Sequence, residues 1–373
     1  MKLIHLSDLH IGKRLNEMSY SDDQKHILVE ILKITNAEKP DAVLIAGDVY
    51  DKSIPSGEAV EIFDDFLFSL SQLCPQVFII SGNHDSPERI SFGSRLMDKS
   101  GVHLSPVYNG TMTKHTISDE HGEINIYMLP FIRPADVRRY FPDEEISSFT
   151  DAVRTAVNSA DIDESTRNII ITHQFVAGAS RCDSEDRVVG GTDCVDSSVF
   201  EKFDYTALGH IHGPQNVGSE KIRYCGTPLK YSFSEESHTK SVTVAELGTK
   251  GSLSIRTIPL KPLRDMRTIK GEFSAISNNT PSDDYIRIIL TDKTEIADAL
   301  NKLRYIYPNI MEFHYETGYT ADFSDIAIDE ESIKNDLFSV FAEFYKAQRG
   351  ADCFTEEKAE YIRKLIEEIE EGE

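Results

Sequence analysis

Five short apolar runs in the first 212 residues are each followed directly by residues of the types that bind metal ions. The runs are KLIHLS, DAVLIAG, QVFIISG, NIIIT and DYTALG, and their Val, Ile and Leu content is typical of strands in a buried sheet. Because such strands end in loops at the sheet edge, the residues that follow them can converge there. The residues concerned are Asp8, His10, Asp48, Asn83, His84, His173, His210 and His212. The pattern predicts a site for two divalent transition metals, as in binuclear metal hydrolases.

Length and composition exclude several classes of protein. The chain has 373 residues, enough for two or three domains, and no segment approaches the roughly 20 apolar residues of a membrane span. The N-terminal MKLIHLSDLH lacks the apolar core and cleavage site of a signal peptide, so we expect a cytoplasmic protein. An odd number of cysteines without CxxC spacing argues against disulfides and thiolate metal sites. We expect all five to be reduced: Cys74, Cys182, Cys194, Cys225 and Cys353.

The formal net charge of −24 is unfavourable for a protein that must bind a polyanion unaided. Either the substrate is small, or metal ions and a partner protein supply the positive charge. The acidity is strongest at the end of the chain, where 16 acidic residues stand against 6 basic ones from Ala321 onward. A charge run of this kind is either a solvated helix face or a surface that docks on a basic partner.

Residues 1–258 alternate apolar runs with helical patterns, which predicts an α/β fold. We expect one helix after Asp22 and a second from Glu58 to Leu73, whose broad apolar stripe fits either a buried core helix or a homodimer face. The segments INIYML and SVTVAEL suggest a second, more antiparallel sheet packed on the first. The prediction is therefore a two-sheet α/β sandwich.

Two further parts follow this domain. Residues 259–320 contain DDYIRIIL, TEIADALNKLRYIY and NIMEFHYE, a strand, helix and strand that predict a small α+β domain. Residues 321–373 comprise a polar linker and two amphipathic helices, which either pack back on the body or bind a partner. Their apolar positions are Ile333, Leu337, Val340, Phe341 and Phe344, then Tyr361, Ile362, Leu365, Ile366 and Ile369.

Single motifs among the ligand candidates are weak signals, since D-x-H occurs by chance in many chains. Asp48 ends an uncharged run, where a carboxylate is costly to bury unless it is paired or metal-bound, and one such group could bridge two cations. In G-N-H-D, Gly82 permits a tight turn that brings the backbone close to the ligand. Asn83 then offers an oxygen ligand, whereas the neighbouring His84 points elsewhere and is free for proton chemistry.

Taken together, D-x-H, G-D-V-Y-D, G-N-H-D, T-H and G-H-I-H resemble the signature of the calcineurin-like metallophosphoesterases. Over essentially the whole chain, IHLSDLHIGKRL, LIAGDVYDKSIPS, SGNHDS, LGHIHGPQ, YCGTPLKYSFSE and KPLRDMR are similar to the SbcD family, the nuclease subunits of bacterial SbcCD complexes. The resemblance implies a metallophosphoesterase domain followed by a capping domain and C-terminal helices.

The resemblance also implies roles for individual residues. One metal would be held by Asp8, His10, Asp48 and His212, and the other by Asp48, Asn83, His173 and His210. The metals would be two Mn²⁺ ions, although other divalent metals suit the same ligands. His84 would donate a proton to the leaving oxygen or stabilise the transition state.

Residues beside these ligands admit more than one interpretation. Asp85 either orients a neighbouring imidazole or caps the helix that begins in SPERI. At Asp51, eukaryotic and archaeal relatives carry a histidine that helps catalysis, whereas the bacterial branch usually has Asp. Lys13 and Arg14 either contact a DNA backbone or are ordinary surface cations, and the same alternatives hold for Arg181 and Arg187.

The implied function is a manganese-dependent DNA nuclease subunit, acting as exonuclease on double-stranded ends and as endonuclease on hairpins or single strands. It would serve DNA repair, recombination and replication at the nucleoid, as a homodimer within a heterotetramer with an SbcC-type ATPase. That partner's coiled-coil base would take the C-terminal helices in a groove. One alternative is a free-standing small-nucleotide phosphodiesterase, which the acidity suits. Another is a non-enzymatic scaffold, against which the spare His84 argues.

Overall fold

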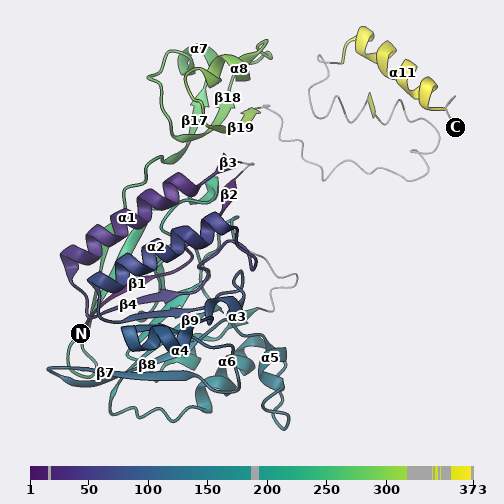
Figure 1. Ribbon diagram of the computed structural model, residues 1–373. Helices are drawn as coiled ribbons and strands as arrows, with labels where there is room; N and C mark the ends of the chain where they lie inside the picture. Colours follow the sequence, from purple (N-terminus) through teal and green to yellow (C-terminus); the bar gives the residue numbers. More distant parts are fainter. Residues whose placement is uncertain are drawn as a thin grey trace. The chain divides into compact units, whose positions relative to one another are not determined.

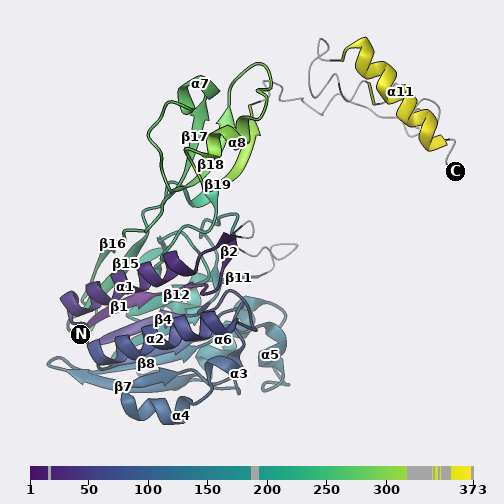
Figure 2. The same ribbon diagram turned by 45° about the horizontal axis from the view of Figure 1, so that its top comes forward.

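Two six-stranded β-sheets pack face to face in the first of the two units, Met1–Arg267 and Thr268–Glu373, into which the chain divides. The computed structural model describes residues 1–15, 18–185, 193–316, 338, 341–342, 345 and 354–370 (Figures 1 and 2). The predicted two-sheet α/β sandwich is confirmed.

Each sheet contains four adjacent parallel strands. In the first sheet the other two strands, joined by antiparallel pairing, both lie on one side of this run, whereas in the second sheet one antiparallel strand lies at each edge. The first sheet has the order β16 (Leu253–Pro259), β15 (Ser241–Leu247), β1 (Lys2–Leu6), β4 (Ala42–Ala46), β5 (Val77–Ile80) and β6 (Val102–Leu104). The second has the order β13 (Gln215–Val217), β14 (Ser219–Tyr224), β12 (Tyr205–Gly209), β9 (Arg167–His173), β8 (Gly122–Leu129) and β7 (Thr113–Asp119).

Alternating side chains of the central strands explain why the sheets form a sandwich. One set from β1, β4 and β5, including Leu3, Leu44 and Phe78, meets residues of the second sheet such as Ile126 and Ile171 in a fully buried core. The other faces are covered by helices. Helices α1 (Ser21–Glu38) and α2 (Gly57–Leu73) lie on the first sheet (Figure 1).

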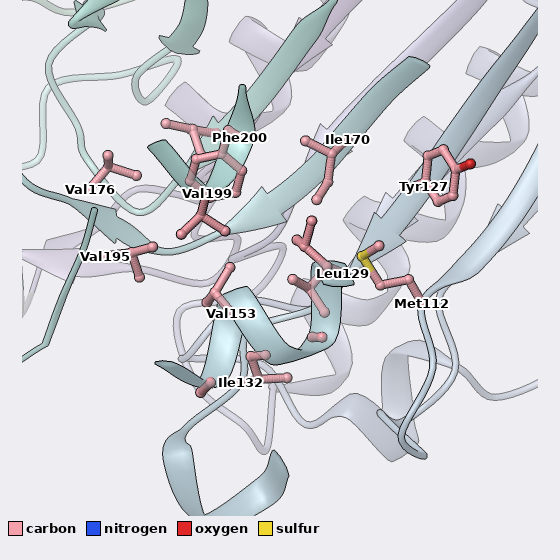
Figure 3. Close-up of a cluster of buried hydrophobic side chains, with 14 of the residues drawn as sticks. Met112, Tyr127, Leu129, Ile132, Val153, Ile170, Val176, Val195, Val199 and Phe200 are labelled. Carbon is pink, nitrogen blue, oxygen red and sulfur yellow. The ribbon is translucent and has the colours of Figure 1, made fainter. Parts of the chain in front are cut away.

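The outer face of the second sheet carries its own apolar cluster, which includes Val153 of α6 (Phe149–Asn158) together with Tyr127, Leu129 and Ile170 of the sheet (Figure 3). The layers therefore run helix, sheet, sheet, helix.

On the other side of the molecule, the apolar residues of α2 fall into a buried and an exposed group. Ile62, Phe63, Phe66, Leu67 and Leu70 are buried, whereas Val60 and Phe68 are 46% and 68% exposed.

The sequence assigned one of these two segments to the wrong sheet. SVTVAEL, expected in the second sheet, forms β15 and pairs antiparallel with β1 in the first. INIYML lies in β8 of the second sheet, as expected, where it pairs antiparallel with β7 and parallel with β9, so this sheet is no more antiparallel than the first. Side-chain alternation cannot distinguish a parallel from an antiparallel neighbour when both faces are buried.

Short elements complete the first unit. They are β2 (Arg14–Leu15), β3 (Met18–Ser19), α3 (Pro87–Ile90), α4 (Ser94–Met97), η1 (Asp98–Ser100), α5 (Pro134–Arg138), β10 (Phe175–Val176), β11 (Cys194–Val195), η2 (Ser197–Phe200) and η3 (Phe233–Glu235). Cys74, Cys182, Cys194 and Cys225 are free thiols, and Cys353 lies outside the described residues. Within the described residues, no helix is both long and apolar enough to cross a membrane.

The second unit contains a three-stranded sheet in the order β17 (Met266–Gly271), β18 (Tyr285–Leu290) and β19 (Ile310–Tyr315), with helices α7 (Phe273–Ile276) and α8 (Ala299–Arg304). β18 and β19 pair in parallel through the connection that contains α8, as the strand–helix–strand pattern predicted. Their apolar faces bury Ile286, Ile288 and Leu303.

The last helix, α11 (Glu356–Glu370), follows the second predicted amphipathic pattern. Most of the first pattern, including Ile333, Leu337, Val340 and Phe344, lies outside the described residues. Where that segment is described, Arg363 of α11 stacks over the ring of Phe338 at 4.4 Å.

Candidate metal centre

All eight candidate ligand and acid residues lie together, but they come from two sheets and not one. Asp8 and His10 follow β1, Asp48 follows β4, and Asn83 and His84 follow β5, all strands of the first sheet. His173 ends β9, and His210 and His212 follow β12, in the second sheet. Because the central strands of each sheet are parallel, their carboxyl ends lie at one edge. The site forms where these edges of the two sheets meet.

The backbone turns sharply at four of these positions. Asp8, His10 and Asp48 have φ values of 52°, 44° and 49°, and His210 has 104°. Such values are uncommon in residues with a side chain, although Asp and His tolerate the left-handed region better than most. The turns are held by hydrogen bonds between the loops, since the Asp8 and His10 N–H groups donate to the Gly47 and Asp48 carbonyls, each at 3.0 Å.

Two glycines allow the loops to approach closely. A Cβ atom on Gly82 would lie 2.5 Å from the Asp48 nitrogen and closer still to its Oδ1. A Cβ atom on Gly209 would lie 2.6 Å from Nδ1 of His173. The close approach expected at Gly82 is therefore present, and it places the backbone of the β5 loop directly against the Asp48 carboxylate.

One half of the site gathers the residues after β1 and β12. The Nε2 atoms of His10 and His212 face each other at 3.2 Å, and His10 Nε2 lies 3.7 Å from Oδ2 of Asp48. One ligand atom each from Asp8, His10 and His212 falls within 4.8 Å of the others. Asp8 is itself held by the N–H of His210, which donates to its carboxylate at 3.0 Å.

The other half shares Asp48. Nε2 of His173 lies 3.3 Å from Oδ2 of Asp48 and 3.0 Å from Oδ1 of Asn83. Nδ1 of His210 lies 2.9 Å from the same Asn83 oxygen. His173 Nδ1 faces the Ala46 carbonyl at 2.8 Å, which leaves Nε2 as its ligand atom. Asp48 thus stands between the two halves, as a bridging ligand would.

Burial and mutual contact shift the protonation of these groups. Burial, followed by the charge of Asp48, raises the pKa of Asp8. Burial alone would also raise the pKa of Asp48, but the imidazole of His173 holds it well below its usual range. Burial lowers the pKa of His210 to about 3. His173 is opposite, because Asp48 and Asp8 outweigh burial and raise its pKa to about 9.

The donor set fits divalent transition metals. Asp8 and Asp48 are 0% and 2% exposed, and no described Lys or Arg lies within ion-pair distance of either. The two carboxylates share the protonated His173, which offsets only part of their charge, so their burial is costly unless a further cation balances them. Carboxylate, amide oxygen and imidazole nitrogen together suit manganese and zinc.

His84 and Asp51 flank the site. Nδ1 of His84 faces the Asp51 carbonyl at 3.0 Å, and its Nε2 lies 3.9 Å from Oδ2 of Asp48. The side chain is 23% exposed, more than those of His10, His173 and His212. His84 therefore reaches the site from the solvent side. The Asp51 carboxylate lies 3.8 Å from Nδ1 of His10, on the side of the ring away from Asp48.

Asp85 fulfils neither of its two predicted roles. Its carboxylate accepts hydrogen bonds from the N–H groups of Val49, Tyr50 and Gly82, at 3.1, 2.9 and 2.9 Å. The α3 helix is capped by Ser86 instead, whose side chain accepts from the Arg89 N–H. Asp85 ties the loop after β4 to the loop after β5, so it positions Asp48 through the backbone. Burial and Asp48 raise its pKa to about 6.

The basic residues near the site differ in their surroundings. Lys13 donates to Asp51 at 2.8 Å and lies over the Tyr231 ring, so its charge is directed into the site. Arg14 is exposed on β2, beside a surface pocket of about 410 Å³ that Asp51 also lines. Arg181 pairs with Asp193, and Arg187 lies outside the described residues.

Sequence reasoning missed the polar groups behind His212. Ser184 Oγ lies 2.8 Å from Nδ1 of His212, and the carboxylate of Glu185 accepts its N–H at 2.7 Å. Glu235 and Lys240 form a buried ion pair next to them. The only sequence signal was the YCGTPLKYSFSE segment, which contains Glu235 but has no ligand spacing.

Comparison with known proteins extends over both units. The family model described as Calcineurin-like phosphoesterase matches residues 1–214, more than half of the chain. A second, described as Type 5 capsule protein repressor C-terminal domain, matches residues 262–349. The predicted metallophosphoesterase fold is thereby confirmed.

Two curated relatives are both named as the SbcD component of the nuclease SbcCD. The protein from Staphylococcus epidermidis is 33% identical over 93% of this chain and 93% of its own length. That from Staphylococcus saprophyticus subsp. saprophyticus is 32% identical over 100% of both. Among solved structures, a dimetal phosphatase from Danio rerio covers 70% of this chain and 98% of its own, with 10% identity and a TM-score of 0.42.

Proposed function

The chain belongs to the SbcD family of calcineurin-like phosphoesterases, and from this membership we propose that it is the manganese-dependent DNA nuclease subunit of an SbcCD-type complex. As a member of this family it is a metal-dependent phosphodiesterase. The proposed substrates are double-stranded ends, cut by an exonuclease activity, and hairpins or single strands, cut by an endonuclease activity. The convergence of ligands from five strand ends on the shared Asp48 carries the proposal.

The ligand assignment follows the two halves of the site. We propose that Asp8, His10, Asp48 and His212 hold one manganese ion, and that Asp48, Asn83, His173 and His210 hold the other. When bound, two such ions activate water near neutral pH and neutralise charge that develops at phosphorus. Asp48 lies between the two halves: its Oδ2 atom is 3.7 Å from Nε2 of His10 in the first sheet and 3.3 Å from Nε2 of His173 in the second.

His84 is the proposed catalytic acid. The Asp51 carbonyl can accept its Nδ1–H, so that Nε2 is the atom directed at the site. A protonated His84 then presents an N–H to the leaving oxygen, and its partly exposed position leaves room for a substrate. Asp51 and Asp85 are proposed to act indirectly, the first on His10 and Lys13, the second on the Asp48 loop.

The division of labour along the chain is also a proposal. Residues 1–258 would form the nuclease domain, residues 259–320 a capping domain, and residues 321–373 the linker and helices that bind an SbcC-type ATPase. In α11, Ala359 is buried while Tyr361 is 64% exposed, so one apolar face remains for a groove. The exposed Val60 and Phe68 of α2 suit the homodimer interface of a heterotetramer. With a net charge of −24, much of the DNA binding would reside on the partner.

The test is manganese-dependent cleavage of a labelled hairpin and a linear duplex by the purified chain, alone and with an SbcC-type ATPase and ATP. We expect weak cleavage of single strands by the chain alone, and strong cleavage of duplex ends with the partner. A chain without residues 325–373 should hydrolyse a small phosphodiester normally but not bind the ATPase. Loss of metal binding in this truncated chain would contradict the proposed domain roles.

The net charge of −24 favours one other function, that of a free-standing phosphodiesterase for a small nucleotide. Brisk hydrolysis of a cyclic nucleotide, with no cleavage of DNA in the presence or absence of the ATPase, would establish that alternative.

A further inference from the structure

A network of buried and partly buried polar groups runs from His212 to Lys240. Oγ of Ser184 lies 2.8 Å from Nδ1 of His212 and 2.6 Å from Oε1 of Glu235. Glu235 is fully buried and forms an ion pair with Lys240, which is only 6% exposed. A buried ion pair of this kind stabilises little by itself, since desolvation offsets much of the attraction. Its position directly behind a ligand candidate suggests a role in the site.

The donor and the acceptor of each hydrogen bond in this polar network follow from the chemistry of its groups. Glu235 faces the Lys240 ammonium and accepts the Tyr231 N–H, so it is an ionised carboxylate that can only accept. Ser184 must therefore donate its single hydroxyl proton to Glu235. Its remaining contact, with Nδ1 of His212, must then be one in which Ser184 accepts. His212 accordingly carries its proton on Nδ1, and the lone pair of Nε2 faces His10 at 3.2 Å.

The main chain of His212 is held by Lys240 and by a further carboxylate, that of Glu185. Its N–H donates to Glu185 at 2.7 Å, and its carbonyl accepts from the Lys240 ammonium at 2.9 Å. Lys240 thus holds the backbone of His212 and, through Glu235 and Ser184, also its ring. Lys240 therefore contributes to both the place and the orientation of the imidazole, while Glu185 holds the N–H of the same residue.

Two other imidazoles of the site, those of His173 and His10, are held differently. Nδ1 of His173 faces a backbone carbonyl, that of Ala46, which no side-chain substitution removes. Nδ1 of His10 has no hydrogen-bond partner among the described residues, and the Asp51 carboxylate lies 3.8 Å away. Of these three imidazoles, His212 is the one whose tautomer is set by a side chain, so it can be altered by a single substitution.

We propose that Ser184, Glu235 and Lys240 are positioning residues that hold His212 as its Nδ1–H tautomer and so tune the affinity of the metal position formed with Asp8 and His10. The inference rests on the proposed function only in taking these residues as metal ligands. Groups that orient a ligating histidine typically change metal affinity by about 10- to 100-fold when they are removed. We therefore expect that disrupting this polar network changes the affinity of one of the two proposed metal positions by a similar factor.

The first test observes the tautomer directly in metal-free protein. Full-length chain with ¹⁵N-labelled histidine is studied by long-range ¹H–¹⁵N correlation NMR, and the His212 signals are identified by their loss in His212→Asn. We expect a protonated Nδ1 in the wild type and in Ser184→Thr, which keeps the hydroxyl. Ser184→Ala should shift His212 toward the Nε2–H form or a mixture. An unchanged Nδ1–H tautomer in Ser184→Ala would overturn the inference.

The second test titrates Mn²⁺ into the same proteins and measures binding by electron paramagnetic resonance of the free ion. Ser184→Ala should weaken one of two binding steps by about 10- to 100-fold, while Ser184→Thr restores it. Ser180→Ala, which changes an exposed serine of the same loop, is the matched control. Equal affinities in all four proteins would overturn the inference. If wild-type protein binds manganese with the expected tautomer but cleaves no DNA, the proposed nuclease function fails and this inference stands.

Discussion

Replacing Gly82 by alanine should disable the metal centre through one added methyl group. The new Cβ atom would lie 2.7 Å from Cγ of Asp48, whereas ordinary contacts of a Cβ atom are 3.4–4 Å. The main chain of Asp48 lies equally close, at 2.5 Å, so the side chain cannot simply rotate away. Relief requires Asp48 and the β5 loop to separate by roughly 1 Å, and a displacement of that size costs about 100-fold in rate. The overpacking should destabilise the fold by about 1–3 kcal/mol.

The assay measures kcat on a small chromogenic phosphodiester, manganese affinity and the free energy of unfolding. Gly57→Ala is the matched control, because a Cβ atom there meets nothing within 4 Å and the residue begins helix α2. We expect the control to match the wild type in all three quantities. If Gly82→Ala kept wild-type kcat and metal affinity, Asp48 would not be the shared ligand that the loop geometry indicates.

Three further predictions follow from the site. His84→Ser should abolish turnover of the small phosphodiester but leave bound manganese, measured by elemental analysis, unchanged; surviving turnover would refute its role as acid. Although burial opposes it, the nearby His212 and Lys240 hold the pKa of Glu235 well below its usual 4.5. The ionised Glu235 therefore stabilises the folded state fully above pH 4.5, and this contribution is lost as the pH falls below 4.5. Below pH 4.5 the urea concentration at the midpoint of unfolding should decrease in the wild type, and it should decrease less in Glu235→Gln. Arg14→Ala should weaken DNA binding and reduce its salt dependence by about one phosphate contact, while hydrolysis of the small phosphodiester stays unchanged. An equal loss of DNA binding and of this hydrolysis would place Arg14 in the catalytic site instead.

The convergence of the candidate ligands could be predicted because each of them follows a local pattern. A short run of Val, Ile and Leu ends in a polar ligand type, and parallel strands bring such ends together whatever their order. The distribution of the strands between two sheets could not be predicted in this way. β4 and β9 are both buried on two faces, so AVLIA and RNIIITH give no indication that they belong to different sheets.

Groups that act through a long-range partner escaped prediction for a different reason. Ser184 and Glu235 are 51 residues apart, and nothing in either segment marks the contact. Asp85 looked like a partner for an imidazole because it stands beside one in the sequence. Its carboxylate instead bonds to three backbone N–H groups, two of them in the loop after β4. Motif spacing therefore identified the side chains that converge, but not the groups that hold their loops.

The geometry of the site also opposes folding in the absence of a cation. Asp8, His10, Asp48 and His210 all have positive φ values, and each such conformation costs of order 1–3 kcal/mol where the surroundings enforce it. Asp8 and Asp48 add two buried carboxylates, and burial together with the charge of Asp48 raises the pKa of Asp8. A bound cation removes this repulsion. Without a cation, the rest of the first unit must stabilise the strained and charged loops of the site.

Metal binding should therefore stabilise the chain measurably. Free ion at 100 times its dissociation constant adds about 2.7 kcal/mol per site, which corresponds to a rise of about 5–10 °C in the unfolding temperature of a unit of this size. Differential scanning calorimetry in EDTA and in excess Mn²⁺ measures the difference, and His84→Ser should retain it because His84 is not among the proposed ligands. Asp48→Asn should lose most of it, since both proposed metal positions share that carboxylate. Equal unfolding temperatures of the wild type with and without manganese would mean that the converging residues do not bind the ion, and that hydrogen bonds such as that between His173 and Ala46 suffice to hold the strained loops.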